Sequence, residues 1–170
     1  MDPIESRRRA LAVLLAGLAL GAAGCDYVAQ RKLIAGQHTE HDVRQLMGVP
    51  TLVWDLPGGA KEWDYVRAPQ GTETLRVSIG PDGRYQGMTQ LLTDANFRNA
   101  RPGMTGDELT RLFSRPNEVH RFERRSEVVW SWRYVGDDGV KTQFHAHLDA
   151  ATGRARHYSR TDDPQERPGA

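Results

Sequence analysis

A segment near the start of the chain returns in its second half, and this repeat limits the fold more than any other feature. Residues 39–50 read TEHDVRQLMGVP and residues 105–116 read TGDELTRLFSRP. Further along, WDYV at 63–66 matches WRYV at 132–135, and GR at 83–84 matches GR at 153–154. Three matches in the same order indicate two tandem copies of one supersecondary unit.

The repeated segment predicts a short capped helix in each copy. The pattern T-x-x-[DE] is a capping box, in which the threonine hydroxyl and the acidic side chain satisfy free N–H groups at a helix start. Apolar residues three and four positions apart then share one helical face, and a proline ends each segment. Helices this short are unstable alone, so each must pack against another element. The apolar residues are Val43, Leu46 and Met47 in the first copy and Leu109, Leu112 and Phe113 in the second.

The segments after each predicted helix read as strands joined by tight turns. In residues 74–79 apolar and polar side chains alternate, and the turn GPDG follows at 80–83. Hairpin connections with alternating strands predict antiparallel sheets that are covered on one face. The predicted strands are 52–54, 61–67, 74–79 and 84–92 in the first copy, and 118–122, 128–135, 141–149 and 154–160 in the second.

The resulting fold class is α+β, with two tandem α-α-β-β-β-β repeats whose short helices pack on one face of antiparallel sheets. We place the first repeat at 32–92 and the second at 93–161. An additional short helix is expected before each capping box, near 27–35 and 94–100. Residues 162–170 are expected to form a disordered tail.

The first 24 residues read as a secretory signal peptide and are left out of the fold. A basic cluster at 7–9 precedes an uncharged run at 10–24, which ends in small residues before Cys25. The run is too short to span a bilayer, which takes about 20 residues. Cys25 is the only cysteine, so it cannot form an internal disulfide. A plain signal peptide with a chance cysteine and a reactive thiol are the alternatives.

The residues before Cys25 resemble a bacterial lipoprotein signal, because Ala23, Gly24 and Cys25 fit its lipobox. The resemblance implies that Cys25 is lipidated on sulfur and acylated on nitrogen, with residues 25–31 as a tether. Several acyl chains would hold the protein stably on a membrane. We expect the outer membrane, on its periplasmic side. The alternative is the inner membrane, because Asp26 directly follows the cysteine.

Together with this signal, the first repeat resembles the BamE family, also called SmpA/OmlA lipoproteins. That resemblance implies an accessory role in outer-membrane protein assembly or envelope integrity, with β-barrel assembly components as partners. The tandem arrangement resembles the β-lactamase-inhibitor-protein architecture. The matching residues are Gly36, Thr39, Asp42, Val43, Leu46, Met47, Gly48, Pro50, Trp63 and Tyr65.

Aromatic residues and two histidines on the predicted strands are candidates for a functional site. Trp130, Trp132 and Tyr134 share one strand face, as do Trp63 and Tyr65 in the first copy. The repetition of aromatic residues at matched positions favours a core role over a protein-binding stripe. His145 and His147 alternate with apolar residues, which places both rings on the opposite, open face. Because no third ligand is visible at fixed spacing, the sequence predicts no metal site. We retain Trp130, Trp132, His145 and His147 as possible protein-binding positions.

No motif for catalysis or for a cofactor is present, so the sequence predicts a non-catalytic protein. Basic and acidic side chains nearly balance, at 23 and 22, which gives no basic excess for binding nucleic acid. Two functions remain: the BamE-like accessory factor, and a periplasmic protein-binding or inhibitor module that grips its partner with the open faces of two adjacent sheets.

Overall fold

The computed structural model describes residues 32–163, which form two antiparallel sheets and a few short helices. The first sheet has the order β1-β2-β3-β4 and the second has the order β5-β6-β7-β8. The first sheet consists of β1 (Leu52–Asp55), β2 (Lys61–Val66), β3 (Thr74–Ile79) and β4 (Tyr85–Gln90). The second consists of β5 (Glu118–Phe122), β6 (Glu127–Val135), β7 (Lys141–Asp149) and β8 (Ala155–Asp162). The helices are α3 (Glu40–Met47), α4 (Asp94–Phe97) and α5 (Gly106–Phe113), with 3-10 turns η1 (Pro57–Gly59) and η2 (Glu123–Arg125).

Both predicted capping boxes are confirmed. The Thr39 hydroxyl caps α3, and its backbone N–H donates to the Asp42 carboxylate at 2.7 Å. Thr105 caps α5 in the same way, with its N–H 2.7 Å from the Glu108 carboxylate. Each cap therefore satisfies two N–H groups that the helix start would leave without partners.

The repeated Gly-Arg pairs also have equivalent roles. Arg84 donates from Nη1 to the Gly36 carbonyl at 3.2 Å, and Arg154 donates from Nη1 to the Gly103 carbonyl at 2.8 Å. A short β-bridge joins Thr39 to Arg84 and another joins Thr105 to Arg154. In each copy, the arginine after the last hairpin turn thus holds the loop that leads into the capped helix.

Each sheet has a helix face, which packs on its own helix, and an opposite outer face. The core of the first copy lies between α3 and its sheet, and that of the second between α4, α5 and theirs. Trp63 and Trp132 are both fully buried at the centres of these cores. Tyr65 and Tyr134 follow two residues later on the same faces. The prediction that the repeated aromatic residues form the core is confirmed.

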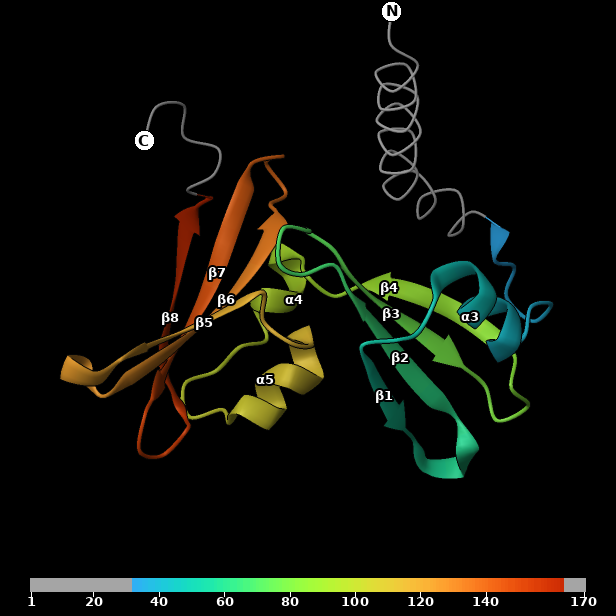
Figure 1. The fold of residues 1–170 in the computed structure, drawn as a ribbon, viewed down its shortest axis with the longest axis horizontal. Coiled ribbons are helices and arrows are strands. Elements are labelled where there is room, and N and C mark those ends of the chain that lie inside the picture. Colours follow the sequence, from blue (N-terminus) through green and yellow to red (C-terminus); the bar gives the residue numbers. More distant parts are fainter. Residues whose placement is uncertain (1–31, 164–170) are drawn as a thin grey trace, which may run out of the picture.

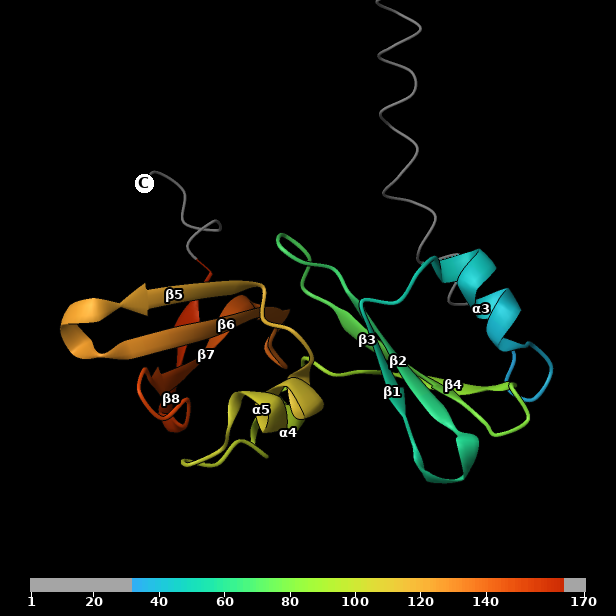
Figure 2. The ribbon, with the colours of Figure 1, turned by 60° about the horizontal axis from the view of Figure 1, so that its bottom comes forward.

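The two copies stack so that α4 and α5 lie between the two sheets (Figures 1 and 2). The C-terminal half of α5 contacts the outer face of the first sheet. There Arg76 donates from Nη1 to the Arg111 carbonyl at 2.8 Å and also pairs with the buried Asp64 at 2.7 Å. Asn117 donates to the Gly71 carbonyl at 3.1 Å and so joins the two copies at a second place.

This stacking corrects the expectation that two open sheet faces lie side by side. The outer face of the first sheet carries a buried carboxylate with an arginine partner, and α5 covers that pair. On the second sheet, too, outer-face side chains of the central strand β6 are buried, as at Val129, Ser131 and Arg133, and the exposed ones lie mainly on the edge strands β5 and β8. The sequence did not reveal this because hydrophobic alternation identifies one covered face of a sheet and is silent about polar contacts on the other.

The structure tests some of the predictions for the short additional helices and for the two ends of the chain. α4 confirms the short helix expected near 94–100, although it is only one turn long. The equivalent helix near 27–35, the signal peptide and Cys25 lie mostly or wholly outside residues 32–163. The predicted tail begins too early: Asp162 belongs to β8, and Asp163 is buried in an ion pair with Arg133 at 2.9 Å. Within the described region, no helix is long and apolar enough to cross a bilayer.

Candidate functional site

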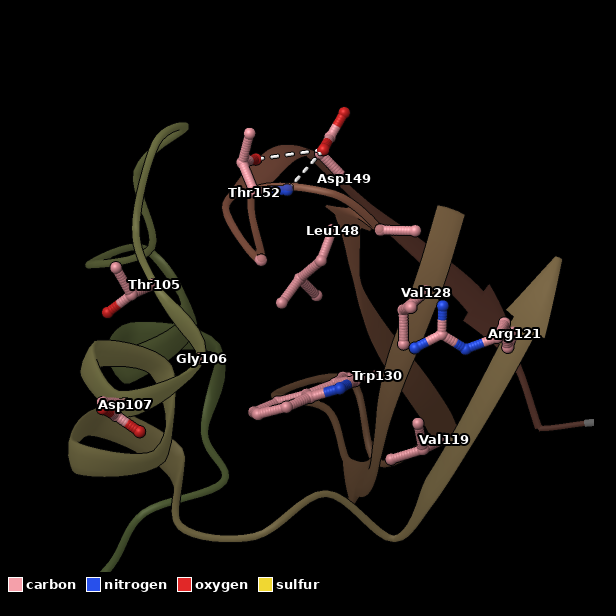
Figure 3. A pocket seen from close by; sticks show the side chains of 12 residues that line it. Thr105, Gly106, Asp107, Val119, Arg121, Val128, Trp130, Leu148, Asp149 and Thr152 are labelled. Carbon is pink, nitrogen blue, oxygen red and sulfur yellow. Dashed lines mark hydrogen bonds between the residues drawn. The ribbon is translucent and has the colours of Figure 1, made fainter. Parts of the chain in front are cut away.

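A groove of about 540 Å³ lies between the start of α5 and the β5–β6 hairpin, and we call it the α5 groove (Figure 3). It lies on the helix face of the second sheet, beyond the part that the helices cover. Its floor is apolar, and 55% of the Val119 surface is accessible to solvent. The floor consists of Val119, Val128, Trp130 and Leu148.

Trp130 lies at the boundary between the core and this groove. Its ring meets that of the buried Trp132 edge-on, with centroids 6.1 Å apart. On the side of α5, the ring approaches Gly106 so closely that a Cβ atom there would lie 2.8 Å from it. Glycine at the first helical position therefore leaves room for one edge of the Trp130 ring beside the start of α5. The rest of the ring lines the groove.

Charged side chains surround the apolar floor. Asp149 accepts hydrogen bonds from the backbone N–H groups of Ala151 and Thr152, and it pairs with Arg156. The Thr152 N–H and the Arg156 guanidinium lower the pKa of Asp149 to about 2, so its charge holds the β7–β8 turn. Arg121 and Asp107 complete the rim. An apolar centre with a charged border is the usual composition of a protein-binding surface.

The strand beside the groove has a free edge. Among residues 32–163, β5 pairs only with β6, so its other side presents backbone groups that no described strand pairs. Four of its five residues are exposed, which leaves this edge accessible. Three arginines lie exposed at or beside its end, against one glutamate, and make this end of the hairpin basic. The arginines are Arg121, Arg124 and Arg125, and the glutamate is Glu123.

The opposite, outer face of the second sheet carries His145 and His147, as the alternation predicted. His145 contacts the hydroxyls of Ser131 at 2.8 Å and Thr161 at 2.9 Å. Burial lowers the pKa of His145, and the nearby His147 lowers it further. Both rings thus lie within a network of side chains on the sheet surface instead of projecting freely towards solvent.

His147 belongs to a cluster that the sequence did not reveal. Its Nδ1 lies 3.1 Å from Oε1 of Glu127, and its ring stacks on His157 with centroids 4.1 Å apart. Glu127 sits on β6 and His157 on β8, so strands on both sides of β7 bring the group together. A regular hairpin turn at 150–153 would place Arg156 opposite His147, and it is a register shift between His147 and Leu148 that brings His157 there instead, so the predicted strands did not indicate this contact.

The structure therefore separates the four residues proposed as a binding surface. Trp130 lines the α5 groove, whereas His145 and His147 lie on the other side of the same sheet. Trp132 is fully buried and belongs to the core, so it has no surface to offer a partner. Sequence reasoning missed Val119 and Val128, because both look like ordinary strand residues until the position of α5 shows that they stay uncovered.

Comparisons with known proteins give little beyond distant structural likeness. No protein-family model matches the chain, and no curated protein matches it. The DUF4309 family protein YjgB from Bacillus subtilis is 15% identical, covering 82% of this chain and 93% of its own, with a TM-score of 0.30. A candidate β-lactamase inhibitor protein from Streptococcus mutans is 7% identical, covering 82% and 98%, with a TM-score of 0.33. At these scores neither structure bears on function.

The expected membership of the BamE family is wrong. No family model matches, and the two similar structures named above are of other proteins. The physical reason lies in the residues that carried the resemblance. Thr39 and Asp42 form a helix cap, Gly48 ends the helix, and Trp63 and Tyr65 fill the core. These roles recur wherever a capped helix packs on a sheet, so they specify local structure and not a family.

Proposed function

We propose that the protein is a non-catalytic binding module of the cell envelope, held on a membrane by lipidated Cys25, and that it captures another protein at the α5 groove. The apolar floor around Trp130, left uncovered beside the free edge of β5, is the observation that supports this function most directly. Tryptophan and arginine dominate the energetics of protein interfaces, and the groove offers both.

The partner we propose is an extended segment of an envelope protein, with apolar side chains flanked by acidic ones. A free edge strand binds such a segment by adding a strand to the sheet, and neighbouring pockets receive alternate side chains. The segment would lie along β5 with its apolar side chains beside Val119 and Trp130. The basic hairpin end, with Arg124 and Arg125 exposed, favours acidic flanks.

The test is site-specific photocrosslinking in intact cells. A benzophenone amino acid at Val119 should give a discrete crosslinked product, which mass spectrometry can identify. Val53 is the matched control, because it is a valine on an edge strand of the first sheet with 48% of its surface exposed, against 55% for Val119. Equal crosslinking at both positions, or none at Val119, would contradict the proposal.

Affinity measurements with the purified partner complete the test. Val119→Glu places a charge on the apolar floor and repels an acidic segment, so it should weaken binding at least about tenfold, as loss of a central contact does. Val53→Glu introduces the same charge at similar exposure and should leave binding unchanged. Circular dichroism of both variants checks that the fold is kept.

A further inference from the structure

We propose that Glu127, His147 and His157, on the outer face of the second sheet, bind one divalent transition-metal ion. One ligand atom from each side chain lies within 4.8 Å of those from the other two. Around a tetrahedral zinc ion, ligand atoms are about 3.4 Å apart, given bonds of about 2.0–2.1 Å. The cluster therefore needs only a modest contraction to hold an ion.

The buried carboxylate of Glu127 favours the binding of a cation. The Glu127 side chain is only 7% exposed, and within the described part of the chain its buried Oε2 has no hydrogen-bond donor. The Arg125 guanidinium lies 3.7 Å from Oε2, which is an ion-pair contact beyond hydrogen-bond distance. A buried carboxylate oxygen with no donor is costly, and a bound cation would remove that cost.

His147 is already oriented as a ligand. Its Nδ1 faces Oε1 of Glu127 at 3.1 Å, and its Nε2 lies 2.9 Å from the hydroxyl of Ser159. Without metal, Nδ1–H donates to the Glu127 carboxylate; when an ion binds, this proton leaves Nδ1, and the Ser159 hydroxyl can accept from Nε2–H while the Nδ1 lone pair binds the ion. Metal-binding histidines are commonly held through their second nitrogen in this way.

His157 supplies the adjustable third ligand. Its ring now stacks nearly parallel to that of His147, with 12° between the planes, and parallel rings cannot both point at one ion. Because His157 is exposed on the edge strand β8, its ring is free to rotate towards the carboxylate. Two imidazoles and one carboxylate suit zinc, and the fourth position would take water or a group from a partner.

Zinc and cobalt titrations of the full chain in detergent micelles test the site. Zinc should bind with a stoichiometry of one in competition with a chromophoric chelator. Cobalt should give the visible absorption of a tetrahedral complex. His157→Ala removes an exposed ligand and should weaken zinc binding at least about tenfold, the minimum loss seen even for residues that only support a ligand. Glu127→Gln should weaken it as well.

His145→Ala is the matched control, because His145 lies two residues away on the same strand and face but outside the cluster. This variant should bind zinc as the parent does. Equal affinities of the parent and His157→Ala would overturn the proposal, as would the absence of tetrahedral cobalt absorption. Because the α5 groove lies on the other side of the sheet, neither result depends on the proposed binding of a protein there.

Discussion

Arg111 of α5 lies 2.6 Å from Glu62 of β2 and so forms an ion pair between the two copies of the repeat. The guanidinium also stacks over the Trp54 ring, 5.2 Å from its centre. Next to this pair, Trp54 donates from Nε1 to the buried carboxylate of Asp64 at 2.9 Å. The outer face of the first sheet is therefore a docking surface for the second copy, and we expect the two copies to unfold together.

The Arg111–Glu62 pair should contribute a measurable coupling energy between the two copies. Because the Arg111 side chain is 40% exposed, we expect only about 0.5–1 kcal/mol, as for other solvent-screened pairs. A double-mutant cycle with Arg111→Ala and Glu62→Gln, read by urea unfolding, measures this coupling. Lys61 and Glu40, paired at 3.0 Å within the first copy, provide the comparison. A zero coupling for Arg111 and Glu62 would show that the neighbouring contacts alone join the copies.

Ser114→Gly should stabilise the protein. Ser114 ends α5 where Gly48 ends α3, and both have a positive φ, 63° and 81°. This backbone conformation strains any residue with a side chain, and the buried Ser114 hydroxyl has no hydrogen-bond partner among the residues that the structure describes. We expect a gain of about 1 kcal/mol in the free energy of unfolding. Gly48→Ser, the reciprocal change, should cost a similar amount. A destabilised Ser114→Gly variant would show that the serine makes a compensating contact.

Positions such as these show what the sequence could and could not predict. Thr39 and Thr105 identified the helix starts, because a capping box is local chemistry between residues three apart. The strands of both sheets followed from alternation and turn residues. The α5 groove and the Glu127 cluster depend on where separate elements pack. Val119 is exposed because α5 does not cover it, and no local sequence pattern shows where on the sheet a helix will pack.

The ionised carboxylate of Asp94 should stabilise the folded protein at neutral pH, and this contribution should be lost in acid. The Tyr134 hydroxyl donates to its carboxylate at 2.7 Å and the Asp137 N–H donates at 2.8 Å, and both lower the pKa of Asp94. Its stabilising contribution is therefore complete above the unfolded pKa of about 3.9 and is lost as pH falls through the lower folded value. Asp94→Asn should be destabilised at pH 7, and the difference from the parent should shrink below about pH 4.

Tyr134→Phe is the matched variant for this effect, because it removes the principal donor but keeps the carboxylate and the buried ring. It should reproduce most of the pH dependence of Asp94→Asn. The measurement is the midpoint of urea unfolding at a series of pH values. If the gap between the parent and Asp94→Asn stays constant from neutral to strongly acidic pH, the hydrogen bonds to Asp94 do not favour its ionised form.

Cys25→Ser should release the protein from the membrane. The lipid anchor is proposed from the basic cluster, the apolar run and the small residues that precede Cys25. Without the thiol, no lipid can be attached there, and the remaining protein should fractionate with soluble periplasmic proteins. Metabolic labelling with a radioactive fatty acid gives a second readout, which the variant should lose. A variant that stays with the membrane and is processed as before would contradict lipid anchoring at this cysteine.

Substitution of Asp26, the residue after the cysteine, tests which membrane holds the protein. We propose the outer membrane, yet Asp26 at this position resembles a signal that retains lipoproteins in the inner membrane. Tyr27 is not one of the residues that usually accompany strong retention, so we expect the parent to band with the outer membrane in a sucrose gradient. Asp26→Ser should then leave the distribution unchanged. If the parent instead bands with the inner membrane and moves outward in Asp26→Ser, the aspartate acts as a retention signal. The partner at the α5 groove should then be sought among proteins that face the periplasm from the inner membrane.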